Sequence, residues 1–470
     1  NPMTMPTPPK AEKRSTTTTW HGFDKTDNYA WLRDEDWQKV MRDPNVLNAD
    51  IRAYLAAEND FTAAVMAPLS DEVDVLFAEM KGRVKEDDTS VPLPDGSWSY
   101  YRRFREGGQH PVFCRIPRDG GAEEILFDGD EAAKGMSYFK LGAFDHSPNH
   151  SLAAYALDQN GSEIFTIRFR DLASRDDMPD VIAGANGGLA WSADSKTILY
   201  TVLDENHRPH AVRRHRLGTD PKDDPWVYTE QDPGFFVGIS VTKSRRFIVI
   251  SAHDHQTSEA YLIPASAPDT KPYLVAPRIV GTEYDLSDQD DRFLIRTNSG
   301  KAEDFKVMTA PLDAPEPDNW TELVAHEEGR LILSIDTFKD YWVRMERVDA
   351  LPRIVITGAD GAEHAIAFDE EAYALDLGGS YEYDTTMVRF TYSSMTTPER
   401  VYDYDMKRRQ RELRKEQEVP SGHDPNDYVT RRLQLAASDG ELVPVSILHR
   451  KDTPIDGSAP VLLYGYGAYG

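Results

Sequence analysis

Cysteine is almost absent from the 470-residue sequence, since Cys114 is the only one. A lone cysteine cannot form an intrachain disulfide, and a zinc site built on several cysteines is excluded. No apolar run approaches the ~18 residues that a membrane-spanning helix needs. Residues 1–19 are polar and rich in Pro and Thr, without the apolar centre of a signal peptide. These absences predict a cytoplasmic protein with a disordered leader to about residue 19.

Positive charge is scarce as well. The chain has 53 Lys and Arg residues against 80 Asp and Glu residues, and its formal net charge is −27. Residues 1–80 carry 8 basic and 14 acidic groups and residues 419–470 carry 4 and 6, so −19 falls on residues 81–418. Such a surface repels nucleic acid and anionic membranes and attracts cationic ligands. We therefore expect neither nucleic acid nor a membrane as a partner; charge that serves only solubility is the alternative.

Residues 20–82 show the spacing of amphipathic helices. Apolar residues recur at intervals of three and four in two stripes, one between Leu47 and Val65 and one between Val73 and Met80. This spacing predicts two helices ahead of everything else. Hydrophobic residues make up 40% of the chain and aromatic residues 10%, which is enough for sizeable cores, and the length favours two or three domains.

From residue 83 the pattern changes to short β-like runs between turns rich in Gly, Asp, Asn and Pro. A unit of two strands joined by a polar turn recurs seven times, with an average step of about 48 residues. The strand pairs are 97–104 with 111–116, 152–156 with 164–169, 197–202 with 211–217, 246–251 with 259–263, 292–297 with 304–309, 341–347 with 353–357, and 387–391 with 400–404. The period predicts a seven-bladed β-propeller over residues 83–418. Two β-sandwiches, the structural alternative, would not keep one period over this length.

The segment after the last repeat has a different character. The basic stretch Lys407–Lys415 fits a solvated outer strand. Residues 432–436 and 443–448 are predicted strands on either side of the turn Ser438–Gly440, and Pro460–Tyr464 is a predicted buried strand that belongs to a new fold.

Side chains that could carry chemistry are few. A serine hydrolase on an α/β sheet has G-x-S-x-G at a strand-to-helix turn, and this pentapeptide is missing. Ser137 and Ser380 follow glycines but lack the final glycine, so we interpret both as structural. Two histidine groups are considered as metal ligands: His253 with His255, and His207 with His210 and His215. Neither group has HExxH spacing, so we expect no metal and no cofactor, and a buried structural role for Cys114.

The stretch Tyr464–Gly470 alternates larger residues with glycine. Glycines directly after a buried strand let the backbone turn sharply at the carboxyl end of a sheet, where α/β folds bind their ligands. A tyrosine held there can present its hydroxyl to a developing oxyanion. An ordinary Gly- and Tyr-rich loop is the alternative for this heptapeptide taken alone.

The segments Asp27–Asp34, Tyr54–Asn59 and Pro460–Gly467, with the helices and the sevenfold repeat, resemble the prolyl oligopeptidase family of serine peptidases. The Trp-Leu-Arg-Asp form of the first segment most resembles the oligopeptidase B branch, which cleaves after Arg or Lys. The resemblance implies a seven-bladed propeller, residues 83–418, inserted into an α/β-hydrolase domain to which residues 1–82 and 419–470 contribute. It also implies that the propeller restricts access to short peptides, and that its first and last blades share no strand.

Tyr466 matches the family residue whose hydroxyl forms half of the oxyanion hole, and it is the one catalytic position that the resemblance carries to this sequence. The nucleophilic serine, its histidine and its aspartate lie downstream in the family. We therefore expect this chain to be a segment of a larger enzyme, with the C-terminal catalytic segment as its partner. The expected function is hydrolysis of short, cationic peptides after Arg or Lys through an acyl-enzyme. A prolyl-specific peptidase and a non-catalytic propeller that binds peptides or proteins are the alternatives.

Overall fold

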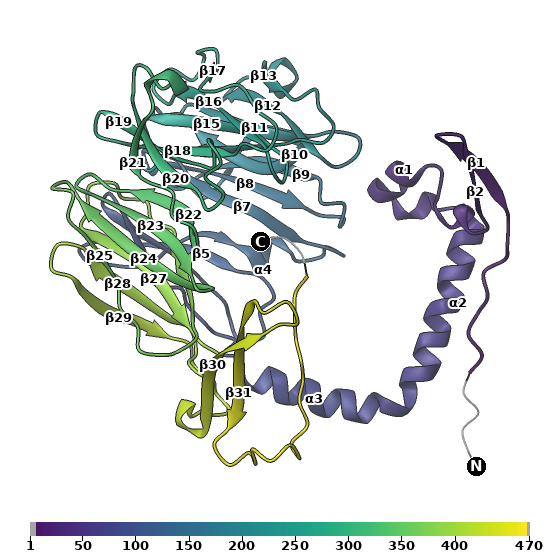
Figure 1. Cartoon of the computed structure of the whole chain (residues 1–470). Helices are drawn as coiled ribbons and strands as arrows, with labels where there is room; N and C mark the ends of the chain where they lie inside the picture. Colours follow the sequence, from purple (N-terminus) through teal and green to yellow (C-terminus); the bar gives the residue numbers. More distant parts are fainter. Residues whose placement is uncertain (1–5, 468–470) are drawn as a thin grey trace. The chain divides into compact units, whose positions relative to one another are not determined.

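A computed structural model describes residues 6–467, which divide into two compact units (Figure 1). Unit 1 comprises Asn1–Val84 and Gly129–Ser240, and unit 2 comprises Lys85–Asp128 and Val241–Gly470. Among the described residues, no helix combines the length and the apolar character that crossing a membrane requires. The domain boundaries expected near residues 82 and 418 stay a prediction.

Unit 1 begins with a hairpin followed by helices. Helices are confirmed at α2 (Ala49–Met66) and α3 (Ser70–Gly82). The strands β1 (Thr16–Trp20) and β2 (Phe23–Asp27) pair antiparallel, so the helical expectation, which began at residue 20, is wrong for Trp20 and for β2. Four consecutive threonines favour a strand because they are β-branched, so the expected disordered leader is also wrong from Thr16 onward. The shorter helices are η1 (Ala30–Leu32), α1 (Trp37–Arg42), η2 (Pro44–Val46) and η3 (Ala67–Leu69).

The rest of unit 1 is built on one seven-stranded antiparallel sheet of consecutive strands. Its elements are β7 (Lys140–His146), β8 (Leu152–Asp158), β9 (Phe165–Asp171), β10 (Asp177–Trp191), β11 (Thr197–Leu203), β12 (Pro209–Arg216) and β13 (Trp226–Thr229), with the short helices α4 (Gly129–Ala132) and η4 (Pro221–Asp223). A single buried apolar cluster extends from Ala154 on β8 to Tyr200 on β11. The sheet is therefore held together by one core.

The strand β10 changes its partner along its length. Its first part pairs with β9, ending at Ala185 opposite Phe165, and its last part pairs with β11 through Leu189–Trp191. The register shifts on both sides of Ala185, where Gly184 and Gly187 take φ values of 74° and 96°. Glycine adopts such angles without the steric cost that a Cβ brings, so these glycines let one long strand serve two sets of neighbours.

Five further sheets have four consecutive antiparallel strands each. They are β3 (Leu93–Asp95), β4 (Trp98–Arg103), β5 (Val112–Pro117) and β6 (Glu124–Asp128); β14 (Phe236–Val241), β15 (Phe247–His253), β16 (Ser258–Pro264) and β17 (Tyr273–Leu274); β18 (Tyr284–Gln289), β19 (Arg292–Thr297), β20 (Lys306–Pro311) and β21 (Thr321–Val324); β22 (Arg330–Thr337), β23 (Tyr341–Val348), β24 (Leu351–Gly358) and β25 (Glu363–Ala365); and β26 (Ala374–Leu377), β27 (Met387–Ser393), β28 (Arg400–Asp405) and β29 (Gln410–Glu416). Unit 2 also contains η5 (Pro317–Asn319) and η6 (Pro425–Asp427).

The structure is a β-propeller in which five blades are separate four-stranded sheets, rather than the seven that the repeat predicts. All seven predicted strand pairs exist as adjacent strands, from β4 with β5 to β27 with β28. The count differs because β10 joins the strands of the second and third repeats into one sheet. The basic stretch 407–415 is confirmed as the turn before β29 and most of that exposed outer strand.

The first and last four-stranded sheets of unit 2 share no strand, as expected. Polar contacts join them instead. Arg389 on β27 pairs with Asp403 and donates from Nη1 to the backbone oxygens of Val91 and Pro92, at 3.0 and 2.9 Å. Lys415 on β29 donates to Asp88 at 2.6 Å. The segment before β3 is thus bonded to the last sheet through side chains.

The residues after β29 form a two-stranded sheet and an irregular tail. The strands β30 (Tyr428–Ala436) and β31 (Leu442–Arg450) pair in register around the predicted turn. The buried strand predicted at Pro460–Tyr464 is wrong, because these residues are irregular and Leu462 is 90% exposed. A strand needs a hydrogen-bonded neighbour, and no described strand pairs with this segment. The expected α/β-hydrolase domain stays a prediction.

Candidate functional site

Tyr466, the predicted oxyanion-hole residue, lies in the irregular tail. Its side chain is 78% exposed, and Tyr464 is similarly exposed. A Cβ added at Gly465 or Gly467 would meet no atom within 4 Å, so the backbone on both sides is open. The structure therefore leaves room around the Tyr466 hydroxyl but brings no described catalytic side chain to it. The predicted Ala468–Gly470 end of the motif lies outside the described residues.

Apolar side chains are exposed on three segments outside the propeller sheets. On α3, Phe77 and Leu76 are about 60% exposed. The face of β31 exposes Leu442 and Leu448, and the tail exposes Val461–Leu463. Contiguous exposed apolar residues mark surfaces that bind another protein surface. Each of these segments was predicted from the sequence as part of a hydrolase domain rather than of the propeller.

The serines and the cysteine are structural in position. Cys114 is 1% exposed on β5, and burial raises the pKa of its thiol to about 11, so the thiol stays protonated and unreactive at neutral pH. Ser380 lies in the turn between β26 and β27, and Ser137 in the connection before β7. Neither serine lies at a strand-to-helix turn, which agrees with the interpretation of both as structural.

The histidines of each predicted group do not converge on a common point. His207 Nε2 lies 2.6 Å from the backbone oxygen of Ser162, and His210 Nδ1 lies 3.2 Å from that of Val202. His253 is the exposed last residue of β15, and His255 is exposed on the turn that follows. Between them, Asp254 accepts hydrogen bonds from the backbone N–H groups of Gln256 and Thr257, which lower its pKa. These positions give no shared geometry for a metal ion.

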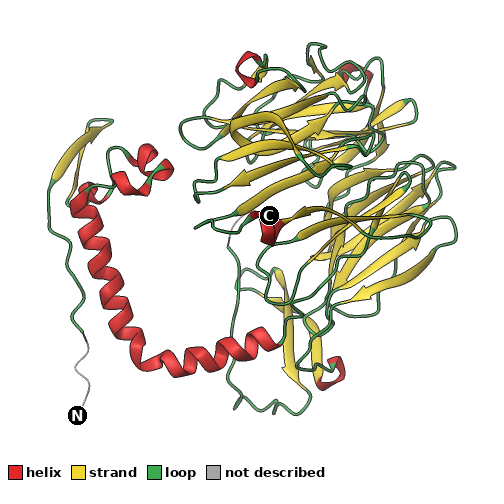
Figure 2. Cartoon of the chain, turned by 180° about the vertical axis from the view of Figure 1, so that it is seen from behind, coloured by secondary structure: helices red, strands yellow, loops and turns green. Residues whose placement is uncertain are grey.

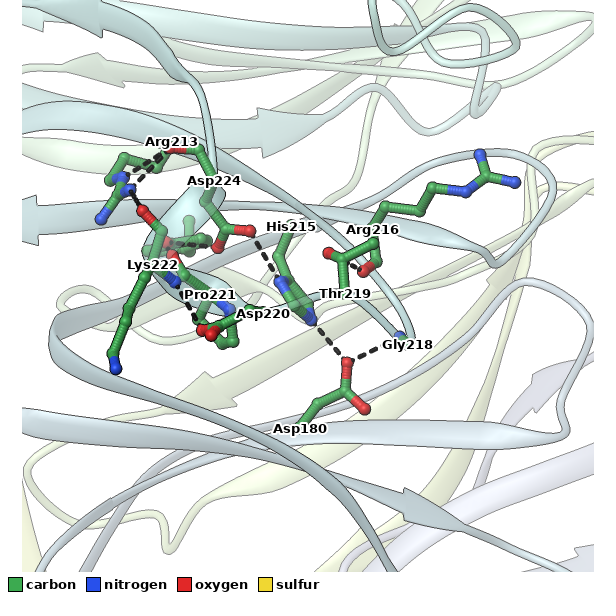
Figure 3. A network of polar contacts seen from close by, with 11 residues as sticks. Asp180, Arg213, His215, Arg216, Gly218, Thr219, Asp220, Pro221, Lys222 and Asp224 are labelled. Carbon is green, nitrogen blue, oxygen red and sulfur yellow. Dashed lines mark hydrogen bonds and ion pairs between the residues drawn. The ribbon is translucent and has the colours of Figure 1, made fainter.

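His215 has a different environment from the other four histidines (Figure 3). Its ring is fully buried on β12, with Nδ1 2.8 Å from Asp224 Oδ1 and Nε2 2.6 Å from Asp180 Oδ2. Both ring nitrogens are therefore engaged by carboxylates. Sequence reasoning placed His215 in a possible metal group and missed this network, because its partners lie 35 and 9 residues away.

One end of the strands in unit 2 is cross-linked by ion pairs, and we call it the paired end. It comprises the turns 96–97, 118–123, 242–246, 265–272, 290–291, 312–320, 338–340, 359–362, 378–386 and 406–409. The turn Thr242–Arg246 supplies three cations to three different sheets. Arg245 donates to Asp95 on β3 at 2.7 Å, and Arg246 donates to Asp288 on β18 at 2.7 Å. Lys243 pairs with Asp336 on β22.

The buried lysine of this turn shows how tightly the paired end is packed. Lys243 Nζ lies 4.0 Å from the ring centroid of Phe338. Burial lowers the pKa of Lys243, although Asp336 acts in the opposite direction. A desolvated ammonium is costly unless it is paired, so this contact depends on the carboxylate that meets it.

The opposite end of the same strands, where β3 begins and β29 ends, is strongly acidic, and we call it the acidic end. It comprises residues 85–92, 104–111, 254–257, 275–283, 298–305, 325–329, 349–350, 366–373, 394–399 and 417–418. These connections contain 16 acidic and 4 basic residues, whereas those of the paired end contain 12 and 9. The negative charge of unit 2 that lies outside the strands is therefore concentrated at one end. The sequence predicted an acidic propeller but not this asymmetry.

Comparison with known proteins gives a consistent family assignment. Residues 8–417 match the family described as "Prolyl oligopeptidase, N-terminal beta-propeller domain". Dipeptidyl aminopeptidase BI of Pseudoxanthomonas mexicana is 37% identical, covering 99% of this chain and 65% of the relative. Protease 2 of Moraxella lacunata is 28% identical, covering 96% and 64%. The chain therefore spans just under two thirds of the length of these two relatives.

Solved structures agree with this match over nearly the whole chain. Oligopeptidase B from Trypanosoma brucei, in a closed form with covalently bound antipain, superimposes with a TM-score of 0.90 at 27% identity, covering 97% of this chain and 67% of that chain. Oligopeptidase B from Leishmania major superimposes with a TM-score of 0.89 at 26% identity, covering 96% and 66%. The similarity includes the segments on both sides of the propeller as well as the propeller itself.

Proposed function

Because the chain belongs to the prolyl oligopeptidase family of serine peptidases, we propose that the complete protein hydrolyses short peptides through an acyl-enzyme, cleaving after Arg or Lys. The observation that carries this proposal is the similarity to two oligopeptidase B structures over 96–97% of the chain. The acidic end of unit 2 supports a cationic substrate, because like-signed charge concentrated near a site raises the local concentration of the opposite charge.

In this proposal the reaction follows the serine-peptidase scheme. A serine hydroxyl attacks the scissile carbonyl, a histidine takes its proton and later returns it to the leaving amine, and an aspartate orients the histidine. These three groups belong to the part of the complete protein beyond the present sequence. Tyr466 contributes the hydroxyl that donates a hydrogen bond to the oxyanion of the tetrahedral intermediate, where negative charge develops only during reaction.

The segments flanking the propeller form part of an α/β-hydrolase domain in this proposal. Its support is the exposed apolar surface of α3, β31 and the tail, which a hydrolase domain would cover. Covering Val461–Leu463 would also supply the neighbouring strands that this segment needs to form the strand expected from its sequence. The seven-stranded sheet then counts as two blades divided at Ala185, which gives the propeller seven blades.

A second candidate function is removal of dipeptides from the free N-terminus of a peptide. The 37% identity to a protein named dipeptidyl aminopeptidase favours it. The two functions differ in what they require of the substrate. An endopeptidase accepts a blocked N-terminus, whereas a dipeptidyl aminopeptidase needs the free ammonium group at the second residue before the cleaved bond.

The test uses the complete protein with paired amide substrates that end in Arg, Lys or Pro, each with a blocked and with a free N-terminus. The proposal predicts cleavage of the Arg and Lys substrates and covalent labelling by a serine-directed phosphonate. Cleavage of free substrates alone would favour the dipeptidyl aminopeptidase, and cleavage of the Pro substrate alone a prolyl peptidase. Absence of both cleavage and labelling would leave only a binding function.

The variant Tyr466→Phe tests the role of the tyrosine. Removing one oxyanion donor lowers kcat by roughly 10²–10³-fold in related chemistry, and we expect the same loss here with little change in KM. Tyr464→Phe is the matched control on the same segment, and its kcat should stay close to that of the parent. Equal effects of both variants would contradict the assignment of Tyr466.

A further inference from the structure

The hydrogen bonds of His215 require more protons than a neutral ring carries (Figure 3). Asp224 Oδ1 lies 2.8 Å from Nδ1 and Asp180 Oδ2 lies 2.6 Å from Nε2. A neutral imidazole has one N–H, so it can donate to only one of the two carboxylates. The other nitrogen would then direct its lone pair at a carboxylate oxygen. Both contacts become hydrogen bonds only when the cluster holds one additional proton.

The remaining contacts place this proton on the ring rather than on a carboxyl group. Gly218 N donates to Asp180 Oδ2, and Tyr200 Oη donates to Asp224 Oδ2, both at 2.8 Å. Burial raises the pKa of Tyr200, and Asp224 raises it further, so the phenol keeps its proton. In these two contacts both carboxylates therefore act as acceptors, as ionised carboxylates do.

Charge balance leads to the same assignment. The guanidinium of Arg213 donates to the backbone oxygen of Asp224 at 2.6 Å. With an imidazolium, the two carboxylates are balanced by two cations; with a neutral ring, one negative charge would stay buried without compensation. A buried uncompensated charge is costly. The strand β9 also packs against His215. It presents the uncharged side chain of Phe169, whose ring stacks on the imidazole with 5.7 Å between the ring centroids.

We propose that His215 is held as an imidazolium ion that locks the two parts of the seven-stranded sheet together, and that loss of its proton opens this part of unit 1. Asp180 lies in the first part of β10, which pairs with β9. Asp224 and Tyr200 belong with β11–β13, beyond the point where β10 changes its partner. The proton therefore bridges the position at which the sheet is least regular. This inference is independent of the proposed peptidase activity.

The proposal predicts in which direction the local stability of unit 1 changes with pH. An unfolded histidine loses its proton above a pH of about 6.5, whereas the folded cluster keeps it, so the folded state binds one proton more in that range. The lock is then fully present below that pH, and the local opening constant rises as pH increases. One extra proton corresponds to at most about a tenfold increase per pH unit.

Protonation can be observed directly on the complete protein labelled with ¹⁵N-histidine. At pH 7.5 we expect both ring nitrogens of His215 to carry a bonded proton, with the signal assigned by its loss in His215→Asn. A nitrogen without a bonded proton at this pH would overturn the proposal. This measurement does not depend on peptidase activity.

Amide hydrogen exchange tests the lock. Between pH 6.5 and 8.5, after correction for intrinsic exchange, the opening constant of β12 should rise by up to tenfold per pH unit, while that of β19 in unit 2 should not. Asp180→Asn supplies an amide N–H that can donate to a neutral ring, so the pH dependence of β12 should disappear. Asp177→Asn, on the same strand and bonded to Tyr155 instead, should keep it. A flat profile in the parent, or an unchanged one in Asp180→Asn, would overturn the proposal.

Discussion

The two ends of the strands in unit 2 have similar lengths of connecting chain but use their charges differently. At the paired end, cations meet carboxylates from sheets that are not neighbours in the chain, as Arg245 meets Asp95. At the acidic end, 16 acidic residues face 4 basic ones. Cations meet carboxylates there at the junction of the first and last sheets, where Lys415 pairs with Asp88 and Lys85 with Glu418. We infer that charge at the paired end serves cohesion, whereas charge at the acidic end is available to a ligand.

The difference also shows how a propeller without a shared closing strand can be held together. Apolar clusters fill the space between adjacent sheets, such as the cluster that includes Phe338, Phe390 and Tyr404. The strands β14–β15 and the strand β3 are separated by many residues of sequence. The ion pair of Arg245 with Asp95 connects them.

The largest effect is expected from breaking the paired end at Arg245. In Arg245→Ala the carboxylate of Asp95, which is 5% exposed as a side chain, loses its cation. Removing the cation from a buried ion pair costs about 2–3 kcal/mol, and the opening free energy of β4 should fall by that amount in hydrogen exchange. The double variant Asp95→Asn with Arg245→Gln removes both charges and should restore most of the loss. Equal losses in both variants would show that the ion pair does not carry the cohesion.

A somewhat smaller effect is expected at the junction of the first and last sheets. Arg389→Ala removes two hydrogen bonds to backbone oxygens before β3 and one of the two cations beside Asp403, while Arg414 remains. We expect a loss of about 2 kcal/mol in the stability of the first sheet, measured by exchange of β4 and β5. The exposed Arg408 provides the control, because Arg408→Ala should change stability by less than about 0.5 kcal/mol.

The acidic end can be tested by removing charge without changing size. The triple variant Glu106→Gln, Glu328→Gln and Asp369→Asn changes three exposed residues of that end. At low salt we expect a roughly 3–10-fold lower kcat/KM for Arg-containing peptides and no change for uncharged ones. The matched control, Asp119→Asn, Asp313→Asn and Asp340→Asn, changes three exposed residues of the paired end. A loss of the same size in the control would mean that only net charge matters.

The smallest effect concerns acid. The guanidinium of Arg103 lowers the pKa of Glu123 to about 2, with a further contribution from the Tyr101 hydroxyl. A lowered pKa stabilises the fold above the unfolded value of about 4.3, and this contribution is lost as pH falls toward 2. Thermal unfolding measured from pH 5 to pH 3 should therefore depend less on pH in Glu123→Gln than in the parent. An unchanged slope would contradict this assignment.

The sequence predicted the strands of the propeller better than their connections. All seven strand pairs could be found because apolar runs and polar turns recur within about 50 residues. The partner change of β10 was missed, since it depends on where Gly184 and Gly187 take positive φ. The cross-sheet pairs of Lys243 and Arg245 were also missed, because their carboxylates lie 93 and 150 residues away and no local pattern connects them.

The structure around the candidate site residues was also not predictable from the local sequence. Tyr466 could be named only through the resemblance of Tyr464–Gly467 to a family motif, and the apolar run before it predicted a buried strand. The segment is exposed and irregular instead, because a strand depends on neighbours that the local sequence does not specify. His215 was named as one of several histidines, while its buried position between two carboxylates came only from the fold.

The most direct test of the account is the salt dependence of kcat/KM for an Arg-terminated peptide amide and for a matched uncharged peptide, measured on the complete protein. We expect the Arg substrate to be cleaved with the higher kcat/KM, and that value to fall as ionic strength rises because screening weakens long-range attraction. The uncharged substrate should be nearly unaffected. No cleavage of either peptide would contradict the proposed peptidase, and cleavage of the Arg substrate without any salt dependence would contradict the role of the acidic end.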